Sequence, residues 1–350
     1  MIKIIKFRDD FNNLSLFQKT KYISELLKDA KKQFYLKWFA VLYSCISIVN
    51  LLGCYLLLLG VGTNILPCRF SFYKTRLSIG PHPNITAVFF SISIGMLVFL
   101  LFEAKKVATK VSLFLLICAY FPLLWLTNSR TSAVLMILFT MGMVFMACVD
   151  KLPKIDAKRA IILVFALCAM AAFLLGLYSV VFANHRDALL ETSNADVDLQ
   201  KSFWDSLASF NGRTEIWESA FDIIFDSWEN FLFGTGDPIY FTHAHNAWIE
   251  CFLRQGVFCF ALSIYYTIRA VKAAIVILFS KKAKSTMAQK SVAMLLLVLL
   301  VVNTMEPYAF VNIVLLANFV FFLLLGYVMA WEKELREKRI VKEKIRYEKI

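Results

Sequence analysis

The chain alternates between long apolar runs and short, polar, basic connections. The apolar runs are continuous and do not alternate residue by residue, which favours membrane-spanning helices over the strands of a closed barrel. A spanning helix needs roughly 20 mostly apolar residues, and eight runs come close to that length. They lie at residues 38–60, 86–102, 111–127, 132–149, 160–183, 247–268, 291–306 and 308–330. The pattern therefore predicts an all-α integral membrane protein with about eight transmembrane helices.

Composition and charge add an orientation to this picture. The chain is 59% hydrophobic with a mean hydropathy of +0.66, which excludes an ordinary soluble domain. Of the 38 Lys and Arg residues, 30 fall on alternate connections. These connections are residues 1–37, 103–110, 150–159, 269–290 and the tail after Trp331. By the positive-inside rule they are cytoplasmic, together with both termini. The net charge of +13 is thus a topology signal and not a nucleic-acid patch.

Three regions follow along the chain. Residues 1–37 form a basic cytoplasmic segment without the apolar core of a signal peptide, and are expected to rest on the anionic inner leaflet. Residues 38–330 form a polytopic membrane domain, and residues 331–350 a charged cytoplasmic tail. Seven of the eight cysteines fall within or at the ends of predicted spans, without metal-ligand spacing. They are expected to be small buried hydrophobic residues.

One large loop, residues 184–245, lies on the outer side in this topology. It carries 11 acidic residues against three basic ones. Apolar residues recur within it at helical spacing, with acidic residues on the opposite face. The apolar positions are Trp217, Phe221, Ile224 and Trp228. The loop is therefore expected to contain an amphipathic helix that begins near Arg213, lies along the membrane surface or roofs the bundle, and ends before "FGTGDP".

Two arginines on the outer side are candidate anion ligands. Arg130 lies in the polar stretch "LTNSRTS" between two apolar runs, and Arg213 lies at a predicted helix N-terminus. Helix N-termini favour anions, and a guanidinium matches two phosphate oxygens at once. Each arginine also has a simpler interpretation. Arg130 would be an interfacial residue that reaches toward water, and Arg213 would pair with an acid of the loop.

The stretch "THAHNAWIECFLRQG", residues 242–256, carries two of the four histidines. His243 and His245 could form a metal pair, but no third ligand lies at a supporting spacing. An imidazole could instead take a proton from a sugar hydroxyl at neutral pH, or simply cap a helix at the interface. Asn246 is a good helix cap in either case. Glu250 and Arg254 lie four residues apart, a spacing that predicts an ion pair on one helix face.

Taken in order, five motifs resemble the O-antigen ligase and O-antigen polymerase superfamily. They are "RLSIGPHPN" (76–84), "NSRTSAVLM" (128–136), "NGRTEIW" (211–217), "LFGTG" (232–236) and "HAHNAWIECFLRQG" (243–256). The resemblance covers about residues 70 to 265. Members usually have around four more spans before the first motif, and a second glycine after "RQG"; this sequence departs from both patterns.

The resemblance implies a multi-pass glycosyltransferase of the bacterial inner membrane, with the large loop and the active site on the periplasmic face. Such enzymes transfer a glycan from undecaprenyl diphosphate to the lipid A core in ligases, or to another lipid-linked glycan in polymerases. It implies that Arg130 and Arg213 hold the diphosphate and that His245 activates the acceptor hydroxyl, without metal or cofactor and with inversion. Supporting roles are expected for four further residues, Arg76, His243, Asn246 and Glu250.

A ligase is the leading interpretation of the sequence, and a polymerase is the alternative, since both share all five motifs. A flippase or other transporter of lipid-linked glycans is the alternative from another class. A transporter predicts charged or broken helices near mid-membrane and repeated halves. In this sequence the candidate site residues cluster at the outer ends of the spans, which favours chemistry at the membrane surface.

Overall fold

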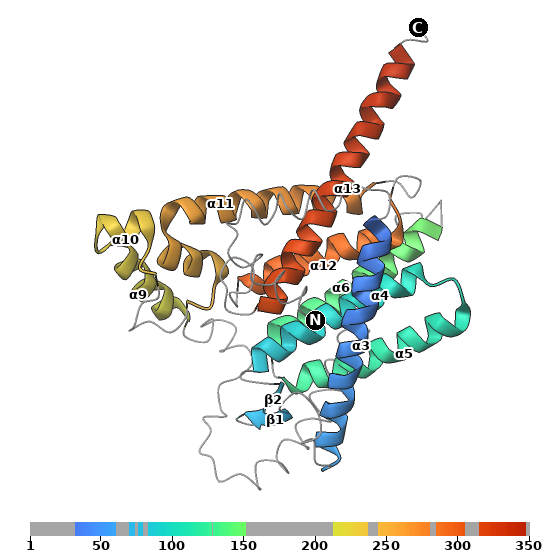
Figure 1. Ribbon diagram of the computed structural model, residues 1–350, viewed down its shortest axis with the longest axis horizontal. Coiled ribbons are helices and arrows are strands. Elements are labelled where there is room, and N and C mark those ends of the chain that lie inside the picture. The colour runs from blue at the N-terminus through green and yellow to red at the C-terminus, as the bar shows by residue number, and fades with distance from the viewer. Residues whose placement is uncertain are drawn as a thin grey trace, which may run out of the picture. The chain divides into compact units, whose positions relative to one another are not determined.

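In the residues that the structure describes, the protein is helical, with one short β-hairpin. The computed structural model describes residues 32–60, 70–73, 76–79, 83–127, 129–151, 213–236, 244–280, 285–304 and 315–347. The elements (Figure 1) are α3 (Lys32–Leu58), β1 (Phe70–Tyr73), β2 (Arg76–Ile79), α4 (Pro83–Glu103), α5 (Val107–Leu126), α6 (Arg130–Lys151), α9 (Arg213–Phe225), α10 (Trp228–Phe233), α11 (Ala247–Leu278), α12 (Met287–Asn303) and α13 (Leu315–Tyr347).

Most described helices coincide with the predicted apolar runs, apart from a break in α11 that is described below. Four are long and apolar enough to cross a membrane: Phe34–Leu58, Pro83–Glu103, Val107–Leu126 and Ala247–Leu278. Two shorter apolar helices, Thr131–Ala147 and Met287–Asn303, cover further predicted spans. The protein is thus a multi-pass helical membrane protein. The predicted span 160–183 lies outside the described residues, so the count of eight stays a prediction.

The chain divides into two compact units, residues 1–42 with 212–350, and residues 43–211. In the second unit, α4 is buried along most of its length, as expected for a helix that is apolar on every side. It packs on α5, α6 and β2. Ser47 of α3 donates a hydrogen bond to Ser93 Oγ of α4 and is 2.5 Å from the Tyr120 hydroxyl of α5. Such hydrogen bonds join helices that lipid alone would not hold together.

A β-hairpin in this unit is an element that the sequence analysis did not predict, in a fold that is otherwise helical in the described residues. β1 pairs antiparallel with β2, with Phe70 opposite Ile79 and Tyr73 opposite Arg76. The Ile79 backbone N–H donates to Thr86 Oγ1 in the first turn of α4 at 2.8 Å. Within "RLSIGPHPN", residues 76–79 form a strand and residues 83 and 84 begin a helix. Two four-residue strands are too short to give a clear periodic signal in the sequence.

In the other unit, α9, α10 and the start of α11 form a small helical layer. Its core consists of Ala220 and Ile224 of α9 with Phe252 and Leu253 of α11. The predicted start of the amphipathic helix at Arg213 is confirmed. The prediction that it continues to the "FGTGDP" segment is wrong. The helix ends at Phe225, and Ser227 caps the separate helix α10 by accepting a hydrogen bond from Asn230 N. On the predicted apolar face, Ile224 is buried within the protein, whereas Phe221 is 39% exposed and Trp228 is 78% exposed.

Helix α11 is broken at Gly256, whose φ of 76° and ψ of −177° are not helical. The prediction of one continuous span over 247–268 is corrected here. A short first segment, residues 247–255, precedes the break, and a longer second segment continues to Leu278 (Figure 1). The sequence "LRQGVF" gives no local sign of a break, because a lone glycine in an apolar run is compatible with a continuous helix.

Helix α13 continues without interruption across the predicted boundary at residue 331 and ends at Tyr347. The charged part of this helix is rich in Glu, Lys and Arg, which are strong helix formers. The side of the membrane on which this segment lies stays a prediction from its basic residues.

Candidate active site

His245 lies in a tight turn, Ala244–Asn246, that leads into α11; we call it the His245 turn. His245 has a φ of 50° and is the only described non-glycine residue with positive φ. This backbone conformation is uncommon for a residue with a side chain and persists only where the surroundings impose it. The side chain of His245 is half-buried. A half-buried imidazole on a constrained turn fits a residue whose position matters for chemistry.

Hydrogen bonds fix the His245 turn from both sides. The Ala244 N–H donates to Glu250 Oε2 at 2.6 Å, and the Ala244 carbonyl accepts from Trp217 Nε1 at 2.8 Å. Asn246 Oδ1 accepts from the Trp248 and Ile249 backbone N–H groups at 3.0 and 3.1 Å. The predicted helix cap at Asn246 is therefore confirmed. Its Nδ2 donates to the carbonyl of Thr304, at the end of α12, at 3.2 Å.

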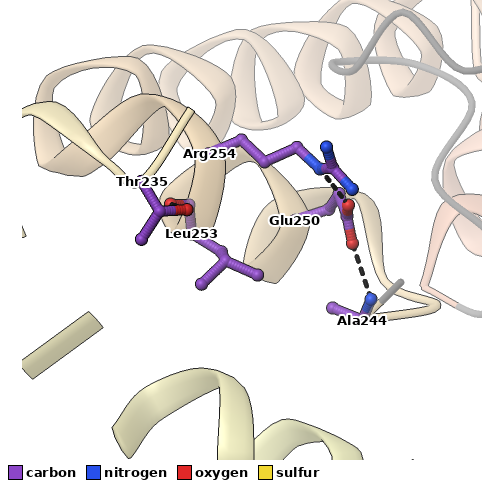
Figure 2. Close-up of polar contacts among 5 residues, drawn as sticks. All are labelled: Thr235, Ala244, Glu250, Leu253 and Arg254. Atoms are coloured by element: carbon purple, nitrogen blue, oxygen red, sulfur yellow. Dashed lines mark hydrogen bonds and ion pairs between the residues drawn. The ribbon is translucent and has the colours of Figure 1, made fainter. Parts of the chain in front are cut away.

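Glu250 and Arg254 form the ion pair that their spacing predicts. Arg254 Nε donates to Glu250 Oε1 (Figure 2), and the side chains are 15% and 0% exposed, respectively. Both carboxylate oxygens of Glu250 thus accept a hydrogen bond, one from Arg254 and one from Ala244. A buried carboxylate needs such partners, because leaving it unpaired in the interior costs several kcal/mol.

Arg213 lies on α9 one helical turn before Trp217, the residue that contacts the His245 turn. It is the first residue of α9 and is half-buried. Trp217 follows one helical turn later on the same face, and its indole reaches the carbonyl of Ala244. Helix α9 therefore contacts the His245 turn through Trp217, one helical turn after Arg213. This contact joins the motifs "NGRTEIW" and "HAHNAWIECFLRQG", which no local pattern in the sequence connects.

Arg76 and Arg130 belong to the other unit. Arg130 is the first residue of α6, and the structure does not describe its side chain. Arg76 Nε donates to the carbonyl of Thr127 at 2.8 Å, and its Nη2 donates to Asn84 Oδ1. Arg76 thus contacts the end of α5, three residues before Arg130 in the chain. The meeting of Arg130 with Arg213 and His245 stays a prediction.

Helix α10 and helix α11 are joined by close backbone contacts at Gly234 and Gly256, which the sequence analysis did not predict. The Thr235 N–H and Oγ1 both donate to the Leu253 carbonyl at 2.8 and 3.0 Å, and the Gly236 N–H donates to the Arg254 carbonyl at 3.2 Å. Figure 2 shows Thr235 beside Leu253. A Cβ on Gly234 would lie 2.4 Å from the Arg254 carbonyl carbon, and one on Gly256 would lie 2.2 Å from the Leu232 carbonyl oxygen. We call this close contact of the two backbones the glycine crossing.

The glycine crossing explains the "LFGTG" motif. The last carbonyl groups of a helix have no partner within it, and Leu253 and Arg254 end the first segment of α11. The donors from Thr235 and Gly236 satisfy both carbonyls. The signal in the sequence was the pair of glycines in "FGTG", which marks a tight turn without revealing its partner.

His243 lies outside the described residues, so the metal pair that it could form with His245 is not described. Among the described residues, no group of three or more His, Cys, Asp and Glu side chains is placed to hold a metal ion.

Replacing Arg76 tests its contact with the α5 end. In Arg76→Met, the carbonyl of Thr127 and the amide oxygen of Asn84 lose the donors described above. An unsatisfied buried polar group costs about 1–3 kcal/mol, so we expect a lower melting temperature in thermal unfolding of the protein in nanodiscs. Arg76→Lys should recover part of the loss. The exposed Lys110 of α5 provides the control, Lys110→Met. Equal melting temperatures for the two methionine variants would contradict the contact.

Two variants separate the functions of Asn246. Asn246→Asp keeps an oxygen that can cap α11 but cannot donate to Thr304, whereas Asn246→Ala removes both contacts. Loss of an N-cap costs about 1 kcal/mol. We expect the alanine variant to melt at the lowest temperature and the aspartate variant at an intermediate one. Thermal unfolding of the purified variants measures this order, and an alanine variant as stable as the parent would exclude a structural role for the cap.

Comparison with known proteins finds a family likeness for part of the chain. Residues 111–264 match the family model described as O-Antigen ligase. The matched segment includes Arg130, Arg213 and His245 and ends within α11. No curated protein matches the chain. Members of the matched family are membrane glycosyltransferase-like ligases and polymerases, and the family implies lipid-linked glycans as substrates. Residues 111–264 are thus similar to the O-antigen ligase superfamily, which agrees with the resemblance seen in the five sequence motifs.

Proposed function

We propose that the protein is an O-antigen ligase-type glycosyltransferase. It would transfer a glycan from undecaprenyl diphosphate to the lipid A core at the periplasmic face of the inner membrane. The observation that supports the proposal is the His245 turn, which hydrogen bonds fix to Glu250 and to Trp217 of α9, the helix that begins at Arg213. The His245 turn and Arg213 both lie in the segment that matches the family.

In the proposed reaction, His245 takes the proton from the acceptor hydroxyl, and the oxygen attacks the anomeric carbon of the donor sugar. The bond between this carbon and the acceptor oxygen forms while the bond to the diphosphate oxygen breaks. Undecaprenyl diphosphate leaves with the electron pair, and the imidazolium later releases its proton. Attack from the side opposite the leaving group inverts the anomeric configuration.

Arg130 and Arg213 would stabilise the negative charge that develops on the leaving diphosphate. Guanidiniums placed before the reaction favour the transition state over the ground state, because the charge on the bridging oxygen appears only as the bond breaks. Two guanidiniums could supply the positive charge that many phosphate-handling enzymes obtain from a metal ion. Arg213 has the additional contribution of the α9 N-terminus.

The lipopolysaccharide of a strain that lacks the gene tests the proposal. Loss of a ligase should leave core without attached units on a gel, and the wild-type gene should restore the ladder. A deletion strain with single attached units would instead identify the polymerase that uses the same donor. An unchanged ladder would contradict both. Purified protein in nanodiscs with lipid-linked glycan and lipid A core should form the joined product. Transbilayer movement of the donor without product would identify a transporter.

A further inference from the structure

We propose that Glu250 is a positioning residue that holds the His245 turn in its reactive conformation; this inference rests on the proposed function. The carboxylate of Glu250 is completely buried, although a buried charge is costly. One oxygen of the carboxylate accepts from Arg254 and the other accepts from the Ala244 backbone N–H, the residue directly before His245. The carboxylate of Glu250 thus holds, by a hydrogen bond, the backbone next to His245, the proposed base.

The contact has a direct geometric effect on His245. The N–H of Ala244 belongs to the peptide group before this residue, and its carbonyl belongs to the peptide group that joins it to His245. Glu250 fixes the first group and Trp217 fixes the second. With Asn246 bound to the start of α11, the backbone on both sides of His245 is fixed. The positive φ of His245 is then maintained by these contacts.

Glu250 is itself tied to the glycine crossing. Arg254, which pairs with Glu250, uses its backbone carbonyl to accept from Gly236. Figure 2 shows the resulting row from Arg254 through Glu250 to Ala244. The imidazole is therefore connected by consecutive contacts to the "LFGTG" turn, which gives that motif a role in the placement of His245.

A purely structural role of the ion pair would not require the contact with Ala244. Paired substitutions separate the two roles. Glu250→Met with Arg254→Met replaces the buried pair by apolar side chains of similar length, which is often neutral for stability, but it leaves the Ala244 N–H without an acceptor. Glu250→Gln with Arg254→Gln also removes both charges but keeps an oxygen that can accept from Ala244.

We expect both double variants to fold, and only the methionine pair to lose most of its activity. A misplacement of about 1 Å at a reacting group can cost roughly 100-fold in rate. The methionine pair should therefore show a kcat lower by about this factor with a KM for the lipid-linked donor near the parent value, because the donor contacts are unchanged. The glutamine pair should recover at least about tenfold of that loss.

Glu332 and Arg336 provide a matched control. They form another ion pair four residues apart, with a buried carboxylate, on α13. Replacing this pair by two methionines should leave kcat unchanged. If the methionine and glutamine pairs at 250 and 254 have the same kcat, Glu250 does not position His245 through Ala244.

A spectroscopic measurement separates this inference from the proposed function. The chain has only four histidines, so the imidazole ¹⁵N signals of histidine-labelled protein in nanodiscs can be assigned with single variants. The His245 signal should shift or broaden in the methionine pair and stay near its parent position in the glutamine pair. An unchanged signal in the methionine pair would overturn the positioning role. An active His245→Asn variant would overturn the proposed function, whereas the ¹⁵N measurement would still test the contact with Ala244.

Discussion

His245→Asn is expected to lower the rate of glycan transfer by about 10²–10⁴-fold, the usual contribution of a general base. Asparagine is the suitable replacement because it tolerates the positive φ of 50° found at this position better than most residues. The contacts that fix the turn come from Ala244 and Asn246, so the variant should fold like the parent. Transfer from a lipid-linked donor in nanodiscs measures the rate, and thermal unfolding reports the fold.

The control for His245→Asn is Glu218→Gln, which alters an exposed acid on α9 without touching the turn. It should keep the parent rate. Arg213→Met should instead raise the KM for the donor as well as lower kcat, because the proposed guanidinium contact exists before and during the reaction. A His245→Asn variant that transfers glycan within about tenfold of the parent would exclude His245 as the general base.

Gly234→Ala is expected to prevent folding or to lower stability severely, whereas Gly236→Ala should have only a small effect. Both glycines have positive φ, 76° and 70°, a backbone conformation that residues with a Cβ rarely adopt, so alanine is strained at either position. The surroundings differ. A Cβ on Gly234 would lie 2.4 Å from the backbone of Arg254 and Gln255, but a Cβ on Gly236 meets nothing within 4 Å. Backbone cannot move aside as a flexible side chain can.

The yield of monodisperse protein after extraction and its melting temperature measure the difference between the two alanine variants. Gly256→Ala should behave like Gly234→Ala, because its Cβ would lie 2.2 Å from the carbonyl oxygen of Leu232. Equal stability of Gly234→Ala and Gly236→Ala would show that the backbones at the glycine crossing can separate without cost.

The sequence predicts the features that depend on local spacing. Apolar runs near the length of a bilayer become helices, Asn246 caps the helix that it precedes, and Glu250 pairs with Arg254 one turn later. Each of these follows from residues a few positions apart. Spacing alone did not connect Arg213 with His245. They are connected in the sequence only through the resemblance to a known family.

The features that the sequence did not predict depend on contacts between distant segments. Gly256 breaks α11 where its backbone meets Leu232, and nothing in the apolar run itself marks that contact. The indole of Trp217 was assigned to an apolar face, although it donates to Ala244, 27 residues later. The end of α9 before Ser227 was missed because the helical spacing of apolar residues continues through Trp228.

The hydrogen bond from Asn246 to Thr304 affects which segment could be exchanged between this protein and a related one. The segment with the family likeness ends at residue 264, but one anchor of the His245 turn is the carbonyl at the end of α12. The likeness therefore does not mark an autonomous module. A hybrid that exchanges residues 111–264 between this protein and a related one would join the His245 turn of one to the α12 of the other. Exchange through Thr304 would keep that contact within one parent.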